Sequence, residues 1–482
     1  MAHEMLWRTT SNAARYRRSV LRLRNPDIPL ITILDGSDGT SLLANLDEKD
    51  TPRTQELHVL NLRSLRRRDD VAQLRSYSQA DLPRLKVLSV RQVLTIAGEG
   101  CPLSLDQSLN LRFMSLWSVS FVPSSTFPNL SHLALSDVYT LECHLETANL
   151  LSRCPNLESV TIDYPHTSQD IAIPPRRHQP LTLDRLQRVT LKLPSFCGSV
   201  VEFYISLFPL STRSTQVPMA LQIHHREIED LSVHFGTLLL HATKATASHL
   251  SLAMSHGSER DDILHFVITA AGPQGAFHIA SEAFRDEHCA GDWDLLHGSF
   301  LNDVLCNGMH LPAVRELWIS GKHPHMGNQK HITAKFKSTI AALPALETIV
   351  FVVTTTTCTP PEGPNLALCP SVLDAGFASH KLKTLRVVYG NATHRGLVVE
   401  TLSLRRLLQH VETGVYGYFE TLILQMEPWL VVSRVDLQRL RGHFATVNYR
   451  HIERMPTMPV PDFCVEPYAG PGGSATWTGS LW

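Results

Sequence analysis

Histidine is the residue type with the most potential chemistry in this sequence, because the chain has 25 of them. Four lie close together at His310, His323, His325 and His331, and His224 and His225 form an adjacent pair. Neutral imidazole is the commonest metal ligand, so such a group is a candidate metal site. The segment around the four is polar and broken by glycine and proline, which favours histidines exposed to solvent. We therefore expect no bound metal.

Carboxylates and catalytic motifs give no stronger candidate. The adjacent pairs Asp69-Asp70 and Asp261-Asp262 do not suit a shared acid–base site, because neighbouring side chains on a helix or strand point apart. The sequence has no Gly-x-Ser-x-Gly elbow, phosphate-binding loop, His-Glu-x-x-His motif or dinucleotide-binding glycine pattern. We expect no catalytic residues and no cofactor. The alternative is an enzyme, or a ligand- or nucleic-acid-binding solenoid, whose site is not visible in the sequence.

The nine cysteines are odd in number, scattered, and never form a Cys-x-x-Cys pair. Tetrahedral zinc sites need close ligand pairs, and a secreted disulfide framework normally needs an even count. This usage predicts buried, reduced thiols in a cytoplasmic or nuclear protein.

Charge and hydropathy exclude further classes of protein. The formal net charge is −1 and the pI is about 7.1, whereas a nucleic-acid-binding domain is usually basic. No apolar run reaches about 18 residues, so no transmembrane helix is expected. An arginine-rich stretch at 8–24 without acidic residues has the composition of a mitochondrial targeting segment. Its apolar residues follow helical spacing, and we favour an amphipathic helix packed on the first repeat.

One apolar pattern recurs along the chain: an apolar residue, two others, an apolar residue, one other, and a third apolar residue. It often follows a Leu-Pro or Phe-Pro step. Clear examples start at residues 57, 85, 111, 130, 157, 186, 314, 346, 382, 419 and 444. The first six starts lie 19–29 residues apart, which matches leucine-rich repeats, and the spacings from 314 to 419 are 32–37.

The repeats predict an α/β leucine-rich-repeat solenoid, in which a curved parallel sheet has helices or irregular segments on its outer side. The last two apolar positions are two apart, so they share one face of a short strand. Residues 145–151 read as a helix on a return path. We expect an N-terminal helix and capping segment at 1–49, the solenoid at 50–454, and a Pro/Gly-rich tail at 455–482 that is an extended end cap or a loose tail. The register at 200–312 is irregular, and 270–312 reads as an insertion or as two degenerate repeats.

The sequence of the repeats resembles that of the F-box/leucine-rich-repeat proteins of mushroom-forming fungi. The resembling segments are NPDIPLITILDG at 25–36, FPNLSHLALSDV at 127–138, CPNLESVTI at 154–162, LPAVRELWISG at 311–321 and PDFCVEPYAGPGG at 461–473. The resemblance implies a protein-binding module that recognises substrates for a ubiquitin ligase. The family's N-terminal F-box, which docks on the adaptor Skp1, has no counterpart here, so we expect no direct Skp1 binding.

Strand alternation also predicts a binding surface for an unknown protein partner. Residues that flank the inward-facing apolar positions point to the concave face of the sheet, where solenoids commonly bind. Tryptophan and arginine are enriched at binding hot spots. The expected partner-binding residues are Arg63, Arg91, Trp117, Arg188, Lys192, Trp318 and Arg386. The alternative is that the two tryptophans pack against neighbouring side chains or a covering loop, and that the arginines are ordinary solvated residues.

Overall fold

The protein is a mixed α/β chain whose main element is a long, mostly parallel sheet. The computed structural model describes residues 30–35, 52, 54–60, 82–93, 109–139, 143–163, 181–193, 198–208, 219–225, 247–256, 263–273, 275–284, 311–321, 336–338, 340–341, 343–355, 364, 366–374, 381–391, 400–461 and 464. The chain divides into two units, which are described separately. Unit 1 comprises Met1–Pro165 and Leu181–Leu186, and unit 2 comprises His166–Pro180 and Gln187–Trp482.

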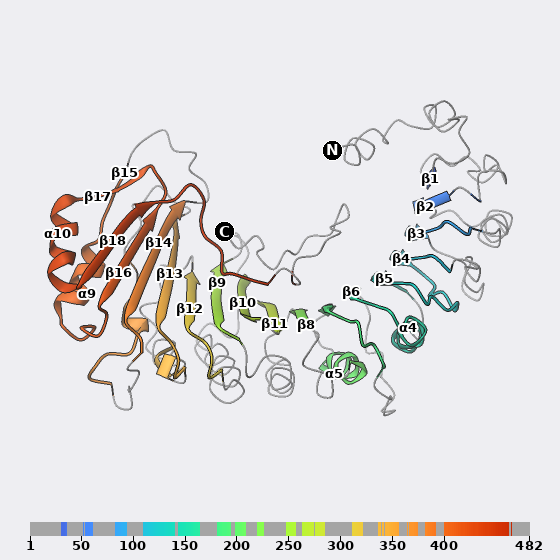
Figure 1. The fold of residues 1–482 in the computed structure, drawn as a ribbon, viewed down its shortest axis with the longest axis horizontal. Coiled ribbons are helices and arrows are strands. Elements are labelled where there is room, and N and C mark those ends of the chain that lie inside the picture. The colour runs from blue at the N-terminus through green and yellow to red at the C-terminus, as the bar shows by residue number, and fades with distance from the viewer. Residues whose placement is uncertain are drawn as a thin grey trace. The chain divides into compact units, whose positions relative to one another are not determined.

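The strands of unit 1 pair in sequence order, and every pair is parallel (Figure 1). They are β1 (Leu30–Asp35), β2 (Thr54–Leu60), β3 (Val87–Val93), β4 (Phe113–Val119), β5 (His132–Val138) and β6 (Ser159–Asp163). Helix α4 (Cys143–Ser152) precedes β6. It covers the segment 145–151 that the sequence predicts to be helical, so that prediction is confirmed.

The sheet of unit 2 is parallel except at one hairpin. Its strands are, in spatial order, β7 (Arg188–Leu193), β8 (Met219–His225), β11 (Gly275–Phe284), β10 (Ile263–Gly272), β9 (His249–His256), β12 (Glu316–Gly321), β13 (Thr348–Thr355), β14 (Thr384–Asn391), β16 (Thr421–Met426) and β18 (Thr446–His451). Strand β10 runs antiparallel to both β9 and β11. The irregular region is thus partly an antiparallel insertion, which begins at Ile263 and widens the sheet between β8 and β9.

The helices of unit 2 lie outside this sheet. Those described in full are α5 (Gly198–Leu207), the short η6 (Leu366–Leu368), α9 (Arg405–Glu412) and α10 (Arg434–His443), and residues 336–338 and 340–341 are also helical. Helices α9 and α10 pack on each other, and α10 contacts β18 (Figure 1). A small parallel pair, β15 (Glu400–Leu402) with β17 (Leu430–Val432), lies close by.

The apolar triplets form the core because they stack in register from strand to strand. In unit 1 one row consists of the buried residues Leu57, Leu88, Met114, Leu133 and Val160. In unit 2 the equivalent row consists of Leu250, Leu317, Ile349, Leu385 and Leu422. Each such side chain is removed from water by its neighbours in the row, which contributes about 1.5–3 kcal/mol per large aliphatic residue.

A tight turn introduces many of these strands. In the turn before β5 the amide of Leu130 donates to the carbonyl of Phe127 at 3.3 Å, and the same bond recurs before β3, β6, β12 and β13. In unit 1 asparagines also connect one turn to the one before it: the side-chain amides of Asn110, Asn129 and Asn156 donate to the carbonyls of Pro83, Leu109 and Pro128. These side chains satisfy carbonyls that the sheet cannot reach.

Candidate functional site

The face of the sheet opposite the buried triplets, here called the front face, holds the predicted partner-binding residues that the structure describes. Unit 1 has Arg91 on β3 and Trp117 on β4, and unit 2 has Arg188, Lys192, Trp318 and Arg386. Arg63 lies outside the described residues. The structure brings Arg91 beside Trp117 on the neighbouring strand β4, and it brings Arg386 of β14 toward Trp318 of β12, with β13 between the two strands.

The unit 1 cluster is centred on Trp117. The guanidinium of Arg91, its register partner on β3, lies over the indole ring at 3.5 Å from the ring centroid. The indole N–H donates to the Asp137 carboxylate at 3.1 Å. Arg91 is exposed and Trp117 is half-buried. The charged and polar partners fix the ring in one orientation while part of its surface remains accessible.

Backbone geometry places Asp137 beside the tryptophan. Ser118 and Asp137 occupy equivalent positions on β4 and β5, and both adopt left-handed conformations with φ of 52° and 51°. Each is one extra residue in its strand and interrupts the alternation of inward and outward side chains. Val119 and Val138, which follow, therefore point into the core. The hydroxyl of Ser118 also reaches Asp137 at 3.5 Å. Sequence alternation alone did not identify Asp137, although the repeated spacing of Leu116 to Val119 and Leu135 to Val138 is a signal for this bulge.

Two further pairs extend the unit 1 cluster along the same face. Phe113 and His132 stack with ring centroids 4.4 Å apart, two rows from Trp117 on the same face. On β2 the carboxylate of Glu56 lies 3.3 Å from the His58 ring. The front face of unit 1 therefore combines aromatic rings with an arginine, and both residue types are enriched at protein-binding surfaces.

Unit 2 repeats the same local arrangement around Trp318. Its indole N–H donates to Glu316, and the guanidinium of Arg386 lies 5.1 Å from the ring centroid. Arg386 in turn donates to the side chain of Gln425 at 2.6 Å. In both units a tryptophan thus has a carboxylate on its N–H and an arginine on its ring face.

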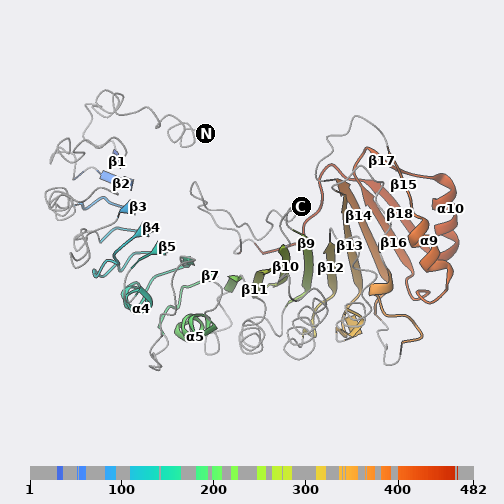
Figure 2. The same ribbon diagram turned by 180° about the vertical axis from the view of Figure 1, so that it is seen from behind.

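The chain's own C-terminal segment covers the front face of unit 2. This segment, residues 452–464, is described at 452–461 and 464, and it runs back from β18 toward β9 and β10 (Figure 1, and from behind in Figure 2). Its Met458 and Cys464 share a hydrophobic cluster with Trp318, and only 2% of Trp318 is exposed. The expectation of an accessible Trp318 is therefore wrong, and the alternative of a covering segment holds for this tryptophan. A loose tail is likewise wrong for these residues.

The β7 residues lie at the other end of the same sheet. Arg188 and Lys192 are half-buried, and both have polar or electrostatic contacts. The positive charge of Arg188 acts on the Cys464 thiol, although burial dominates and raises the pKa of that thiol to about 12. Arg188 thus borders the C-terminal segment and is not an isolated solvated arginine.

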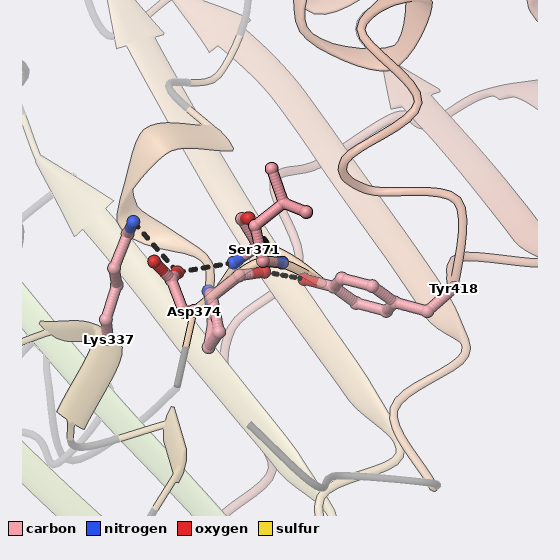
Figure 3. A network of polar contacts seen from close by, with 6 residues as sticks. Lys337, Ser371, Asp374 and Tyr418 are labelled. Atoms are coloured by element: carbon pink, nitrogen blue, oxygen red, sulfur yellow. Dashed lines mark hydrogen bonds and ion pairs between the residues drawn. The ribbon is translucent and has the colours of Figure 1, made fainter. Parts of the chain in front are cut away.

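A separate polar network joins the loops next to β13, β14 and β16 (Figure 3). The Asp374 carboxylate accepts from the backbone amide of Ser371 at 2.6 Å and pairs with Lys337 at 2.9 Å, which holds the pKa of Asp374 below its usual range. The Tyr418 hydroxyl donates to the Pro370 carbonyl at 2.7 Å. Burial raises the pKa of Tyr418, so the phenol stays protonated and its proton is engaged. The network fixes a loop, and its groups are not poised for acid–base chemistry.

The described cysteines and histidines form no metal site. Cys143, Cys154, Cys369 and Cys464 are buried free thiols, as the cysteine usage predicts, and burial raises the pKa of Cys154 to about 12. Within the described ranges no group of three or more His, Cys, Asp or Glu side chains could hold an ion. The histidine group at 310–331 lies outside those ranges.

Comparisons of the chain with protein-family models, with curated proteins and with solved structures found no match. Among the described helices, none has the length and apolar composition needed to cross a membrane.

Proposed function

We propose that this chain is a leucine-rich-repeat solenoid that binds protein partners without catalysing a reaction, and that the front face of unit 1 is a partner-binding site. The observation that supports this most is the cluster of Arg91, Trp117 and Asp137. A half-buried tryptophan held by two charged neighbours loses little conformational freedom on binding, and tryptophan and arginine dominate binding hot spots.

The repeat architecture supports the proposal at a larger scale. Parallel strands in register, many of them introduced by the same turn, are what stacked repeats produce. The resemblance to F-box/leucine-rich-repeat proteins favours a role in recognising substrates for a ubiquitin ligase in the cytoplasm or nucleus. Direct binding of Skp1 is not expected, and a pull-down with purified Skp1 tests this.

The proposal is tested by quantitative affinity purification with the full chain as bait. The variants Arg91→Ala and Trp117→Ala are compared with wild type. Arg84→Ala is the matched arginine control, since Arg84 is exposed in the turn before β3. Trp429→Ala is the matched tryptophan control, because Trp429 is half-buried in unit 2 and also donates to a carboxylate, that of Glu427, at 2.9 Å.

At least one protein captured by wild type should be lost from both front-face variants and retained by both controls. If the two front-face variants capture the same proteins as wild type in the same amounts, the front face of unit 1 is not the binding site.

A further inference from the structure

The front face of unit 2 has an apolar floor, unlike the polar and aromatic front face of unit 1. Val350 and Val388 are fully buried there, beside Trp318. Where the inserted hairpin widens the sheet, three small residues, Ala220, Ala276 and Ala271, are successive register partners. Their short side chains let a second peptide approach the strands closely, and this apolar floor of Trp318, Val350, Val388 and the three alanines is here called the channel.

The C-terminal segment packs onto this channel with apolar side chains that are two or three positions apart. Ile452, Met455, Val460 and the buried Met458 pack onto the cluster, and Cys464 is buried at its far end. Between them Glu453, Arg454, Thr457 and Pro459 are exposed. The segment therefore presents one apolar edge to the sheet and one polar edge to solvent, as a bound extended peptide does.

Side chains and not backbone pairing hold the segment in place. Its described backbone hydrogen bonds are that of Ile452 N–H to Met426 O at 2.8 Å, which continues β18, and that of Cys464 N–H to Pro461 O at 2.9 Å, within the segment itself. Pro456, Pro459 and Pro461 have no N–H and cannot extend a sheet. Such a segment can leave the face without breaking the ladder of the sheet.

One glycine of the floor fits the segment closely. A Cβ placed on Gly390 of β14 would lie 2.2 Å from the Met455 sulfur, far inside van der Waals contact. With any other residue at this position the flexible Met455 side chain would have to shift, so glycine lets Met455 lie close to the strand.

We propose that the front face of unit 2 is a binding site for extended, apolar, proline-containing peptides, and that residues 452–464 occupy it as an intramolecular ligand. A partner peptide with unbranched apolar side chains at the spacing of Met455 and Met458 binds by displacing the segment. A tethered ligand has an effective concentration in the millimolar range, so the free site is masked until a stronger peptide competes. This inference concerns unit 2 and does not depend on the proposed site in unit 1.

The test first removes the C-terminal segment from the channel by mutation and then measures whether a separate peptide binds there. The full chain with Met455→Asp and Met458→Asp cannot bury its segment without burying charge. The probe is a fluorescent synthetic peptide of residues 452–464 with Cys464→Ser, and its binding is followed by anisotropy. The double variant should bind the probe at least about tenfold more tightly than wild type. A probe carrying the same two aspartates should not bind.

Alkylation of the thiols, followed by mass spectrometry at the peptide level, reports on the segment itself. Cys464 should react at least about tenfold faster in the double variant than in wild type. Cys154, buried in unit 1, should stay protected and shows that the fold persists. Thr457→Asp puts the same charge on the exposed edge and should leave Cys464 protected. The single variant Gly390→Val should also make Cys464 reactive, because the valine would collide with Met455. Adding Met455→Ala to Gly390→Val removes this collision and should restore the protection of Cys464.

The inference is overturned if Cys154 becomes reactive in the double variant, or if Cys464 remains protected in it. It is also overturned if Cys464 becomes reactive but the double variant does not bind the probe. A wild-type dimer that forms at high concentration and is abolished by Met458→Asp would support it, because exchange of segments between two copies uses the same site.

Discussion

Two tryptophans on the front face have the same polar partners and opposite exposure. Trp117 donates to Asp137 under Arg91, and Trp318 donates to Glu316 under Arg386. A cation over an indole contributes about 0.5–1 kcal/mol when exposed and about 2 when desolvated. The arginine and the carboxylate therefore hold each indole ring in place. The two tryptophans differ in that the C-terminal segment covers Trp318.

His144 of helix α4 gives a prediction on pH. Burial lowers its pKa from 6.5 to about 4, so the folded protein binds a proton more weakly than the unfolded chain does. Its contribution to stability is complete above pH 6.5 and is lost as the pH falls toward 4, by on the order of 2 kcal/mol. Chemical unfolding at several pH values should show a smaller loss over this window in His144→Gln. An identical pH dependence in both proteins would show that His144 does not titrate as described.

Tyr389 gives a prediction on stability. Its side chain is fully buried on β14, and its hydroxyl has no hydrogen-bond partner among the described residues. A buried hydroxyl without a partner costs about 1–3 kcal/mol. Tyr389→Phe should therefore unfold at an equal or higher temperature than wild type. A clear decrease in the melting temperature would mean that the hydroxyl has a partner in solution.

The residues of the candidate site could be predicted only in part. Alternation placed Arg91, Trp117, Trp318 and Arg386 on the front face, because large aliphatic residues marked the inward positions on either side. It could not show that Trp318 is buried, since the covering residues lie more than 130 positions further along the sequence. Nor could it identify Asp137, which contacts Trp117 through a bulge.

At the scale of elements, the repeated bulge on β4 and β5 gives the next prediction. Ser118 has a φ of 52°, which a β-branched residue adopts only at a cost of about 1–2 kcal/mol. Ser118→Val should lower the free energy of unfolding by about that amount, whereas Ser118→Gly should change it by less than about 1 kcal/mol. Equal stability of the two variants in urea unfolding would argue against the left-handed bulge.

The sequence predicts many of the parallel strands because an apolar triplet marks them. No clear triplet marks β1, β8 or β9, and the triplet at Leu57 is out of register, since Leu57 pairs with Leu88, the second residue of the next triplet. The inserted hairpin could not be predicted in this way. Strands β10 and β11 are apolar on both faces where the C-terminal segment covers them, as at Ala271 and Ala276, so their pattern lacks the usual alternation. The segment itself has no secondary-structure period, because its prolines exclude both helix and ladder.

At the scale of the whole molecule, the front faces of the two units are of two kinds. The face of unit 1 is half-exposed, polar and aromatic, and that of unit 2 is apolar and filled by the chain itself. We interpret the first as a surface for folded partners and the second as a channel for extended peptides.

The affinity of a purified partner for the Trp117→Ala variant tests the central claim most directly. The partner is one that affinity purification identifies, and the dissociation constant is measured by titration against wild type, Trp117→Ala and the Trp429→Ala control. We predict that Trp117→Ala weakens binding at least about tenfold, or about 1.4 kcal/mol, while Trp429→Ala leaves it unchanged. A correctly folded Trp117→Ala protein that binds the partner as tightly as wild type would contradict the account.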